Sequence, residues 1–98
     1  MGCGLSWSTL GSTHHTTEDI AVLKAIPNLT IFSPASPLGL GKVMKKAYEI
    51  KGPTYIRMGM SNEKEIYEKD YALETGKNIV IKNGKSATFL QVSLFLNY

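Results

Sequence analysis

Two segments in the first half of the chain carry the apolar spacing of short amphipathic helices. The first begins with Thr16 or Thr17, either of which can cap a helix, and it closes just before Pro27. The second begins at residues 36–37, where serine is a capping residue and proline suits the first helical position. Its apolar positions recur at three- and four-residue spacing until residues 51–53, Lys-Gly-Pro, end it.

Two short β-prone runs alternate with these helices. Residues 29–32 are Leu-Thr-Ile-Phe and residues 54–58 are Thr-Tyr-Ile-Arg-Met. The resulting order is helix, strand, helix, strand, which is typical of parallel strands joined by helical crossovers. The sequence therefore predicts an α/β fold with a parallel βαβ unit.

The second half of the chain has a different pattern. Residues 61–78 are mostly polar with little periodicity, as in a linker or an edge segment. Residues 79–81 and 87–90 are short β-prone runs on either side of Asn83-Gly84, a pattern that predicts a β-hairpin. The apolar stretch 89–96 has nothing after it to cover it, so we expect a truncated domain.

The apolar stripes of the two helices and the two strands define an expected core. Replacing a fully buried member such as Leu23 with alanine would cost about 2–5 kcal/mol. The expected core residues are Ile20, Leu23, Ile31, Phe32, Val43, Met44, Ala47 and Ile56.

Composition and charge exclude several classes of partner. The net charge of +3 is a mild excess, and all but one of the 11 cationic residues are lysines, which argues against a nucleic-acid surface. No apolar run approaches the length of about 20 residues that a membrane helix needs. The single Cys3 excludes an intrachain disulfide and favours a reducing compartment, so we expect a cytoplasmic protein.

Residues 1–6 also fit an N-myristoylation pattern, with Cys3 as a second acylation position. Two acyl chains would anchor a protein firmly to a membrane surface. An acylated or purely structural interaction protein is therefore the alternative function.

Polar residues that could take part in chemistry are clustered at Thr13-His14-His15, which precede two acidic residues. Imidazole can donate, accept or transfer protons near neutral pH, and a loop that enters a helix offers backbone N–H groups to anions. Two adjacent histidines cannot easily face one metal, so no metal site is expected here. From composition alone, two solvated or structural histidines are the favoured interpretation.

The order of several motifs is more informative than their composition. Residues 4–21 read Gly-Leu-Ser, then Leu-Gly-Ser-Thr-His-His, then Glu-Asp-Ile-Ala. Residues 23–30, 33–35, 52–57 and 74–77 follow with Leu-Lys-Ala-Ile-Pro-Asn-Leu-Thr, Ser-Pro-Ala, Gly-Pro-Thr-Tyr-Ile-Arg and Glu-Thr-Gly-Lys. In this order and spacing the chain resembles the transketolase family, of the transketolase and deoxyxylulose-phosphate synthase type, through about residue 90.

The resemblance implies a division of the chain into three regions. These are the latter part of a pyrimidine-binding domain (1–61), a linker (62–76) and the truncated start of a C-terminal domain (77–98). The implied fold is therefore a parallel-sheet βαβ fragment followed by a linker and a β-hairpin.

The family binds thiamine diphosphate and magnesium between two subunits and moves two-carbon ketol units between sugars or keto acids. The family's acidic Gly-Asp-Gly type motif and its activating glutamate have no counterpart here. We therefore expect this chain alone to bind no cofactor and to be inactive. The complete enzyme would be a homodimer or would pair with a complementary subunit, and its substrate would be a sugar or a keto acid.

The resemblance also assigns site residues. His14 would face the active-site channel as a catalytic and substrate-binding residue, and His15 is a weaker substrate-binding candidate. Arg57 is either a substrate-binding residue or a structural one. Met60 stands where members that use phosphorylated sugars carry a phosphate-binding arginine, which argues against phosphosugar specificity. Ser12 replaces a common proline and leaves the turn before His14 less restrained.

Overall fold

The computed structural model describes residues 3–59, 64–67 and 70–90. Its elements, in chain order, are η1 (Ser8–Leu10), η2 (Ser12–His14), α1 (Asp19–Leu23), β1 (Thr30–Phe32), α2 (Pro37–Glu49) and β2 (Thr54–Ile56). Here η denotes a 3₁₀ turn.

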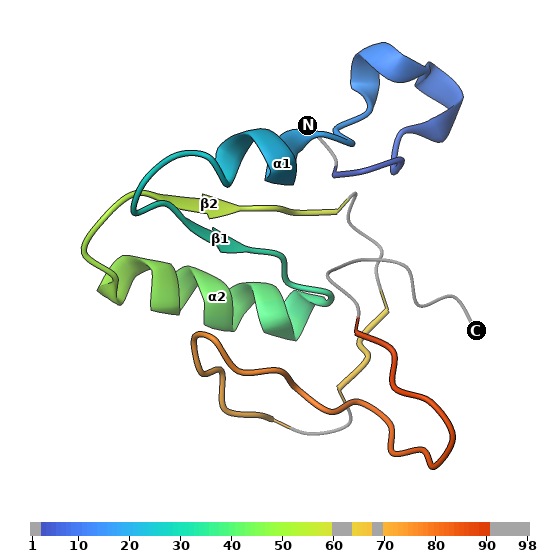
Figure 1. Ribbon diagram of the computed structural model, residues 1–98, viewed down its shortest axis with the longest axis vertical. Helices are drawn as coiled ribbons and strands as arrows, with labels where there is room; N and C mark the ends of the chain where they lie inside the picture. The colour runs from blue at the N-terminus through green and yellow to red at the C-terminus, as the bar shows by residue number, and fades with distance from the viewer. Residues whose placement is uncertain (1–2, 60–63, 68–69, 91–98) are drawn as a thin grey trace.

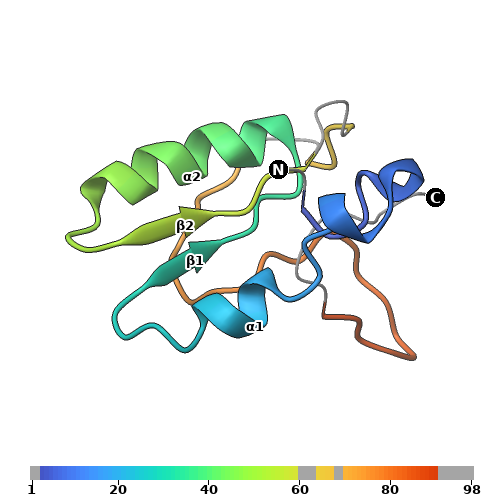
Figure 2. The same cartoon turned by 90° about the horizontal axis from the view of Figure 1, so that it is seen from above.

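The two strands form a parallel pair, as the alternation of elements predicts. In register, Thr30 lies opposite Thr54 and Phe32 opposite Ile56. Helix α2 connects the strands, and α1 and α2 lie on opposite faces of the sheet (Figures 1 and 2). The expected parallel βαβ arrangement is confirmed.

Helix α2 begins where its sequence signal predicts. The Ser36 side chain accepts a hydrogen bond from the Gly39 N–H at 3.2 Å, and proline occupies the first turn. The helix ends at Glu49, and the extended backbone of Ile50 leads through Gly52-Pro53 to β2. Both predicted boundaries of this helix are confirmed.

Helix α1 is shorter than predicted, and neither threonine caps it. Glu18 occupies the capping position without a side-chain cap hydrogen bond. Thr16 instead forms an antiparallel bridge with Gly4, in which each backbone N–H donates to the other residue's carbonyl. Because this pairing keeps the backbone extended at Thr16, the helix cannot start there.

The core is smaller than the apolar stripes predict. Phe32 and Val43 are buried, while most of the other expected members are half-buried. Met44 is 58% exposed, so its assignment to the core is wrong. Helix α2 packs on the strands along one narrow line that passes through Val43, and Met44 lies one position away from that line. Cys3, which the patterns did not place in the core, is 4% exposed.

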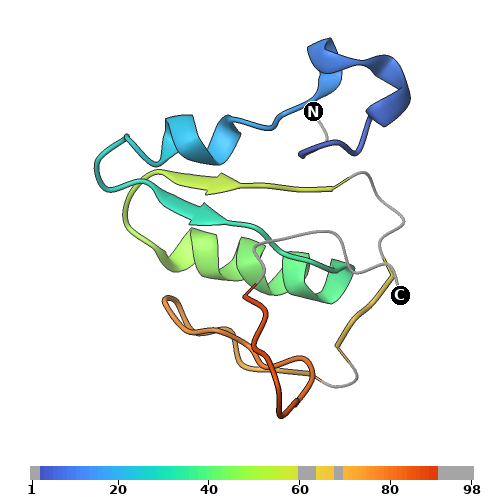
Figure 3. The same cartoon turned by 45° about the vertical axis from the view of Figure 1, so that its right-hand side comes forward.

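The predicted hairpin is absent from residues 77–90, where the structure describes only irregular chain. Figure 3 shows the segment that contains these residues, in orange and red, as an open loop beside α2. The apolar side chains Val80, Ile81, Phe89 and Leu90 are all exposed. A two-stranded hairpin is marginal unless its apolar face packs on another surface, and these four side chains are uncovered.

The helix glycines provide a matched test of packing against α2. A methyl group at Gly41 would meet nothing within 4 Å, so Gly41→Ala is expected to raise the free energy of unfolding by about 0.5–1 kcal/mol. At Gly39 the same methyl group would lie 3.0 Å from the Tyr71 hydroxyl and 3.4 Å from Ser36 Oγ. Gly39→Ala is therefore expected to raise the free energy of unfolding by less than Gly41→Ala. Urea unfolding of both variants measures the difference, and an equal gain would show that Tyr71 does not rest on α2.

Candidate functional site

The histidine pair lies in a loop made of the two 3₁₀ turns η1 and η2. This loop, residues 8–15, is called the histidine loop. The His14 N–H donates to the Gly11 carbonyl at 3.0 Å, and the His15 N–H donates to the Ser12 carbonyl at 3.3 Å. Figure 1 shows this loop, in blue, beyond the carboxyl ends of β1 and β2. Ligands in parallel α/β folds bind beyond this end of the sheet.

The imidazole of His14 is exposed and has a side-chain partner in the loop. Its Nδ1 lies 3.0 Å from Thr13 Oγ1. If the Thr13 hydroxyl donates to Nδ1, the neutral ring carries its proton on Nε2 and presents a donor outward. If Nδ1 donates to the hydroxyl, Nε2 is an outward acceptor. In both tautomers, Thr13 restrains the ring and leaves Nε2 available to a ligand.

His15 occupies a different environment from its neighbour. It is half-buried, and its Nε2 is buried without a hydrogen-bond partner among the described residues. Its backbone is extended, with φ −82° and ψ 149°, and leads directly into the Thr16–Gly4 bridge. Of the two histidine rings, that of His14 is therefore the more exposed to solvent.

Arg57 follows β2 and forms a part-buried ion pair with Asp19. Arg57 Nε donates to Asp19 Oδ2 at 2.8 Å, and the Tyr55 hydroxyl donates to the same oxygen at 3.0 Å. The Arg57 and Asp19 side chains are 11% and 10% exposed. Arg57 Nη2 also donates to the Thr16 carbonyl at 3.2 Å. The guanidinium thus joins β2, the start of α1 and the end of the histidine loop.

These contacts shift the pKa values of all three groups. Burial alone would raise the pKa of Asp19, but hydrogen bonds from Arg57 and Tyr55 outweigh it and hold the pKa below the ordinary value of 3.8. Burial and the hydrogen bond to Asp19 raise the pKa of Tyr55. For Arg57, burial lowers the pKa, but the bond to Asp19 more than offsets it and the net shift is upward. The network is therefore ionised at neutral pH, with Tyr55 as a neutral donor.

The described residues contain no cluster of metal-ligating side chains. No three of their His, Cys, Asp and Glu side chains are placed to hold a metal ion. Asp19, an acid shortly after the histidine loop, is engaged by Arg57.

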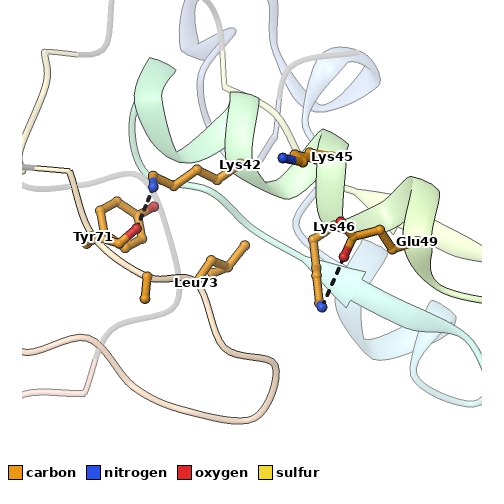
Figure 4. A pocket seen from close by; sticks show the side chains of 7 residues that line it. Lys42, Lys45, Lys46, Glu49, Tyr71 and Leu73 are labelled. Atoms are coloured by element: carbon orange, nitrogen blue, oxygen red, sulfur yellow. Dashed lines mark hydrogen bonds and ion pairs between the residues drawn. The ribbon is translucent and has the colours of Figure 1, made fainter.

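A separate pocket of about 230 Å³ lies between α2 and residues 71–73 (Figure 4). Lys42 binds the Tyr71 carbonyl and Asp70, and its Nζ lies 4.9 Å from the centre of the Tyr71 ring. Burial and the neighbouring Tyr67 raise the pKa of Tyr71. None of the histidine-loop residues lines this pocket. Its lining is Lys42, Lys45, Lys46, Glu49, Tyr71, Ala72 and Leu73.

Several expectations meet the structure only in part. Met60 lies outside the described residues, so its place relative to the loop stays a prediction. Cys3 is buried, and its N–H donates to the Met58 carbonyl. This burial does not favour acylation of Cys3 in the folded chain. In the described part of the chain, no helix has the length and apolarity to span a membrane.

The patterns missed the partners of Arg57. Tyr55 and Arg57 are two positions apart at the end of a strand, so their side chains point to the same face. Asp19 is an acid at the start of the helix that covers this face. A polar pair on one face of a strand, opposite a helix that starts with an acid, is the signal that could have revealed the network.

Comparison with known proteins places this architecture in a family. Residues 1–64 match the family model described as "Transketolase, pyrimidine binding domain". The chain is 34% identical over 86% of its length to a subunit of the apulose-4-phosphate transketolase of Actinobacillus succinogenes. It is 32% identical over 89% of its length to a putative transketolase C-terminal section of Methanocaldococcus jannaschii. It is 38% identical over 90% of its length to the 1-deoxy-D-xylulose-5-phosphate synthase of Thermus thermophilus.

The chain spans 27%, 28% and 14% of the lengths of these three relatives. The matched residues include the histidine loop, both helices and both strands. This chain belongs to the transketolase family, and its residues 1–64 match that family's pyrimidine-binding domain.

Proposed function

We propose that this chain contributes the histidine loop to an enzyme that transfers two-carbon ketol units with thiamine diphosphate. The observation that carries the proposal is the exposed His14 ring, restrained by Thr13 beyond the carboxyl ends of two parallel strands. The substrate class is a sugar or a keto acid. Both have oxygen atoms that an imidazole N–H can bind.

In this proposal His14 uses Nε2 to donate to a substrate hydroxyl or to an oxygen that gains negative charge during the reaction. A donor held in place before the reaction stabilises that charge without having to reorganise. Thr13 supports this role because its hydroxyl can occupy Nδ1 and leave the ring proton on Nε2. His15 is the weaker substrate-binding candidate, since its Nε2 is buried.

The cofactor and its magnesium ion are proposed to be held by residues other than those described. The sequence has no counterpart of the family's diphosphate motif or its activating glutamate, and we propose that the chain alone is inactive. A second copy or a complementary subunit is the proposed partner. The names of two relatives, one a transketolase subunit and the other a C-terminal section, support pairing of the second kind. The single cysteine supports a cytoplasmic location.

A graft tests this function. Residues 1–64 replace the matching segment of the Actinobacillus succinogenes subunit, and transfer of a two-carbon unit is assayed with thiamine diphosphate, magnesium and the rest of that enzyme. The grafted enzyme is expected to catalyse transfer, whereas the 98-residue chain assayed alone is the control and is expected to show none. A graft that folds and binds the cofactor but transfers nothing contradicts the proposal.

A further inference from the structure

We propose that Arg57 is a positioning residue for His14, acting through Thr16, rather than a residue that contacts the substrate. This inference rests on the proposed function of His14. It adds an explanation of what holds the His14 ring in place. The contacts that carry the inference join Arg57 to Thr16 and Thr16 to Gly4, and the backbone then runs from Thr16 through His15 to His14.

The first step is the geometry of the guanidinium. Its Nε donates to Asp19 and its Nη2 donates to the Thr16 carbonyl, so one planar group holds two separate segments at once. The fork of donors on arginine is rigid, so the two contacts fix each other's direction. The ion pair is about nine-tenths buried, which limits competition from water.

The second step is the local support of Thr16. Its N–H donates to the Gly4 carbonyl at 3.0 Å, and its carbonyl accepts from the Gly4 N–H at 3.2 Å as well as from Arg57. Gly4 has φ 57°, and a methyl group there would lie 3.4 Å from Arg57 Nη2. The guanidinium is thus packed closely against the backbone bridge that it stabilises.

The third step connects Thr16 to the ring of His14. Only His15 separates the two residues, and His15 is extended with its N–H bonded back to Ser12. The end of the turn is therefore held within the loop by the bonds of His14 to Gly11 and of His15 to Ser12, and beyond the loop by Thr16. If the Thr16 support is lost, the loop can pivot about Gly11, which has φ 78°.

A direct substrate contact by Arg57 is the competing interpretation. It requires a side chain that is 11% exposed to reach a ligand while the contacts to Asp19 and Thr16 persist. The two interpretations predict different kinetics. Mispositioning of His14 lowers kcat, whereas loss of a ground-state substrate contact raises KM.

The test begins with Arg57→Lys in the 98-residue chain, followed by amide hydrogen exchange. Lysine can still pair with Asp19, but it lacks the rigid second donor that reaches Thr16. We expect the Thr16 and Gly4 amides to exchange about 10-fold faster, because their bridge opens locally. The Thr30 and Leu40 amides, which lie in the sheet and α2, are expected to be unchanged.

Two further variants keep the test decisive. Asp19→Leu with Arg57→Met removes both charges together and is expected to give the same local pattern. Lys51→Met, at an exposed lysine, is the control and is expected to change neither set of amides. The proposal is overturned if both Arg57 variants loosen all amides alike or leave Thr16 and Gly4 unchanged.

The kinetic arm uses Arg57→Lys in the grafted enzyme. A lower kcat with an unchanged KM supports positioning, and a raised KM with an unchanged kcat indicates direct contact and overturns the proposal. The exchange measurement needs no activity, so an inactive graft would count against the proposed function of His14 and leave the Arg57–Thr16 coupling to be decided by exchange.

Discussion

Replacing His14 with alanine in the grafted enzyme is expected to lower turnover by about 10²–10³-fold, the usual cost of one lost donor to a developing negative charge. The expectation follows from the exposed ring and its Thr13 partner at 3.0 Å. The measurement is the steady-state kcat for two-carbon transfer. The effect should appear in kcat more than in KM, because the interaction strengthens as charge develops.

Two neighbouring substitutions serve as controls for the His14 result. His15→Ala is expected to lower turnover less than His14→Ala, since the Nε2 of His15 is buried. Thr13→Val removes the hydroxyl beside Nδ1 and should give an intermediate loss, because the ring remains but is no longer restrained. Unchanged turnover in His14→Ala would mean that the role assigned to this residue is wrong.

Asp19→Asn is expected to lower the free energy of unfolding at pH 7 by about 1–3 kcal/mol, because it leaves the guanidinium of a part-buried ion pair without its counter-charge. Both side chains of the Asp19–Arg57 pair are about nine-tenths buried, and Tyr55 donates to the same carboxylate oxygen. Urea unfolding measures the change. Asp70→Asn is the matched control, because that acid is highly exposed in its pair with Lys42 and should alter stability little.

The effect of Asp19→Asn should depend on pH in a defined direction. The pKa of Asp19 is lower in the folded chain than its ordinary value of 3.8, so the carboxylate stabilises the fold fully above that value. This stabilisation is lost as the pH falls through the lower folded pKa, where the native aspartate becomes protonated. The stability difference between native chain and variant should therefore shrink in acid. A difference that is constant down to the lowest accessible pH would show that the ion pair is not its source.

The elements with local sequence signals were predictable. Ser36-Pro37 and Gly52-Pro53 fix the ends of α2 through capping and ring geometry, and both strands lie within the predicted runs. The start of α1 was not predictable from Thr16 and Thr17, because a distant backbone partner, Gly4, competes for Thr16. The hairpin prediction failed for a similar reason: two β-prone runs around Asn83-Gly84 form a stable hairpin only where their apolar side chains are covered.

The candidate site also contains some features that the sequence could suggest and others that it could not. His14 became a candidate through the resemblance carried by the order of several motifs, and its role stays a prediction. The ion pair of Asp19 and Arg57 joins residues 38 positions apart, so it could be inferred only by combining the polar pair at the end of β2 with the acid at the start of α1. Met44 was assigned to the core because helical spacing gives an apolar stripe but not the width of the surface that covers it.

Two contacts with α2 change how far the remainder of the chain can move. Glu65 accepts from the Leu38 N–H at the start of α2, and Lys42 holds the Tyr71 carbonyl along the same helix. Composition predicts a linker here, yet these contacts fasten it at two points. Whatever follows Leu73 is therefore attached by a shorter tether than the sequence implies. A shorter tether raises the effective concentration of the attached segment near α2, so its docking there costs less entropy than docking from a free linker would.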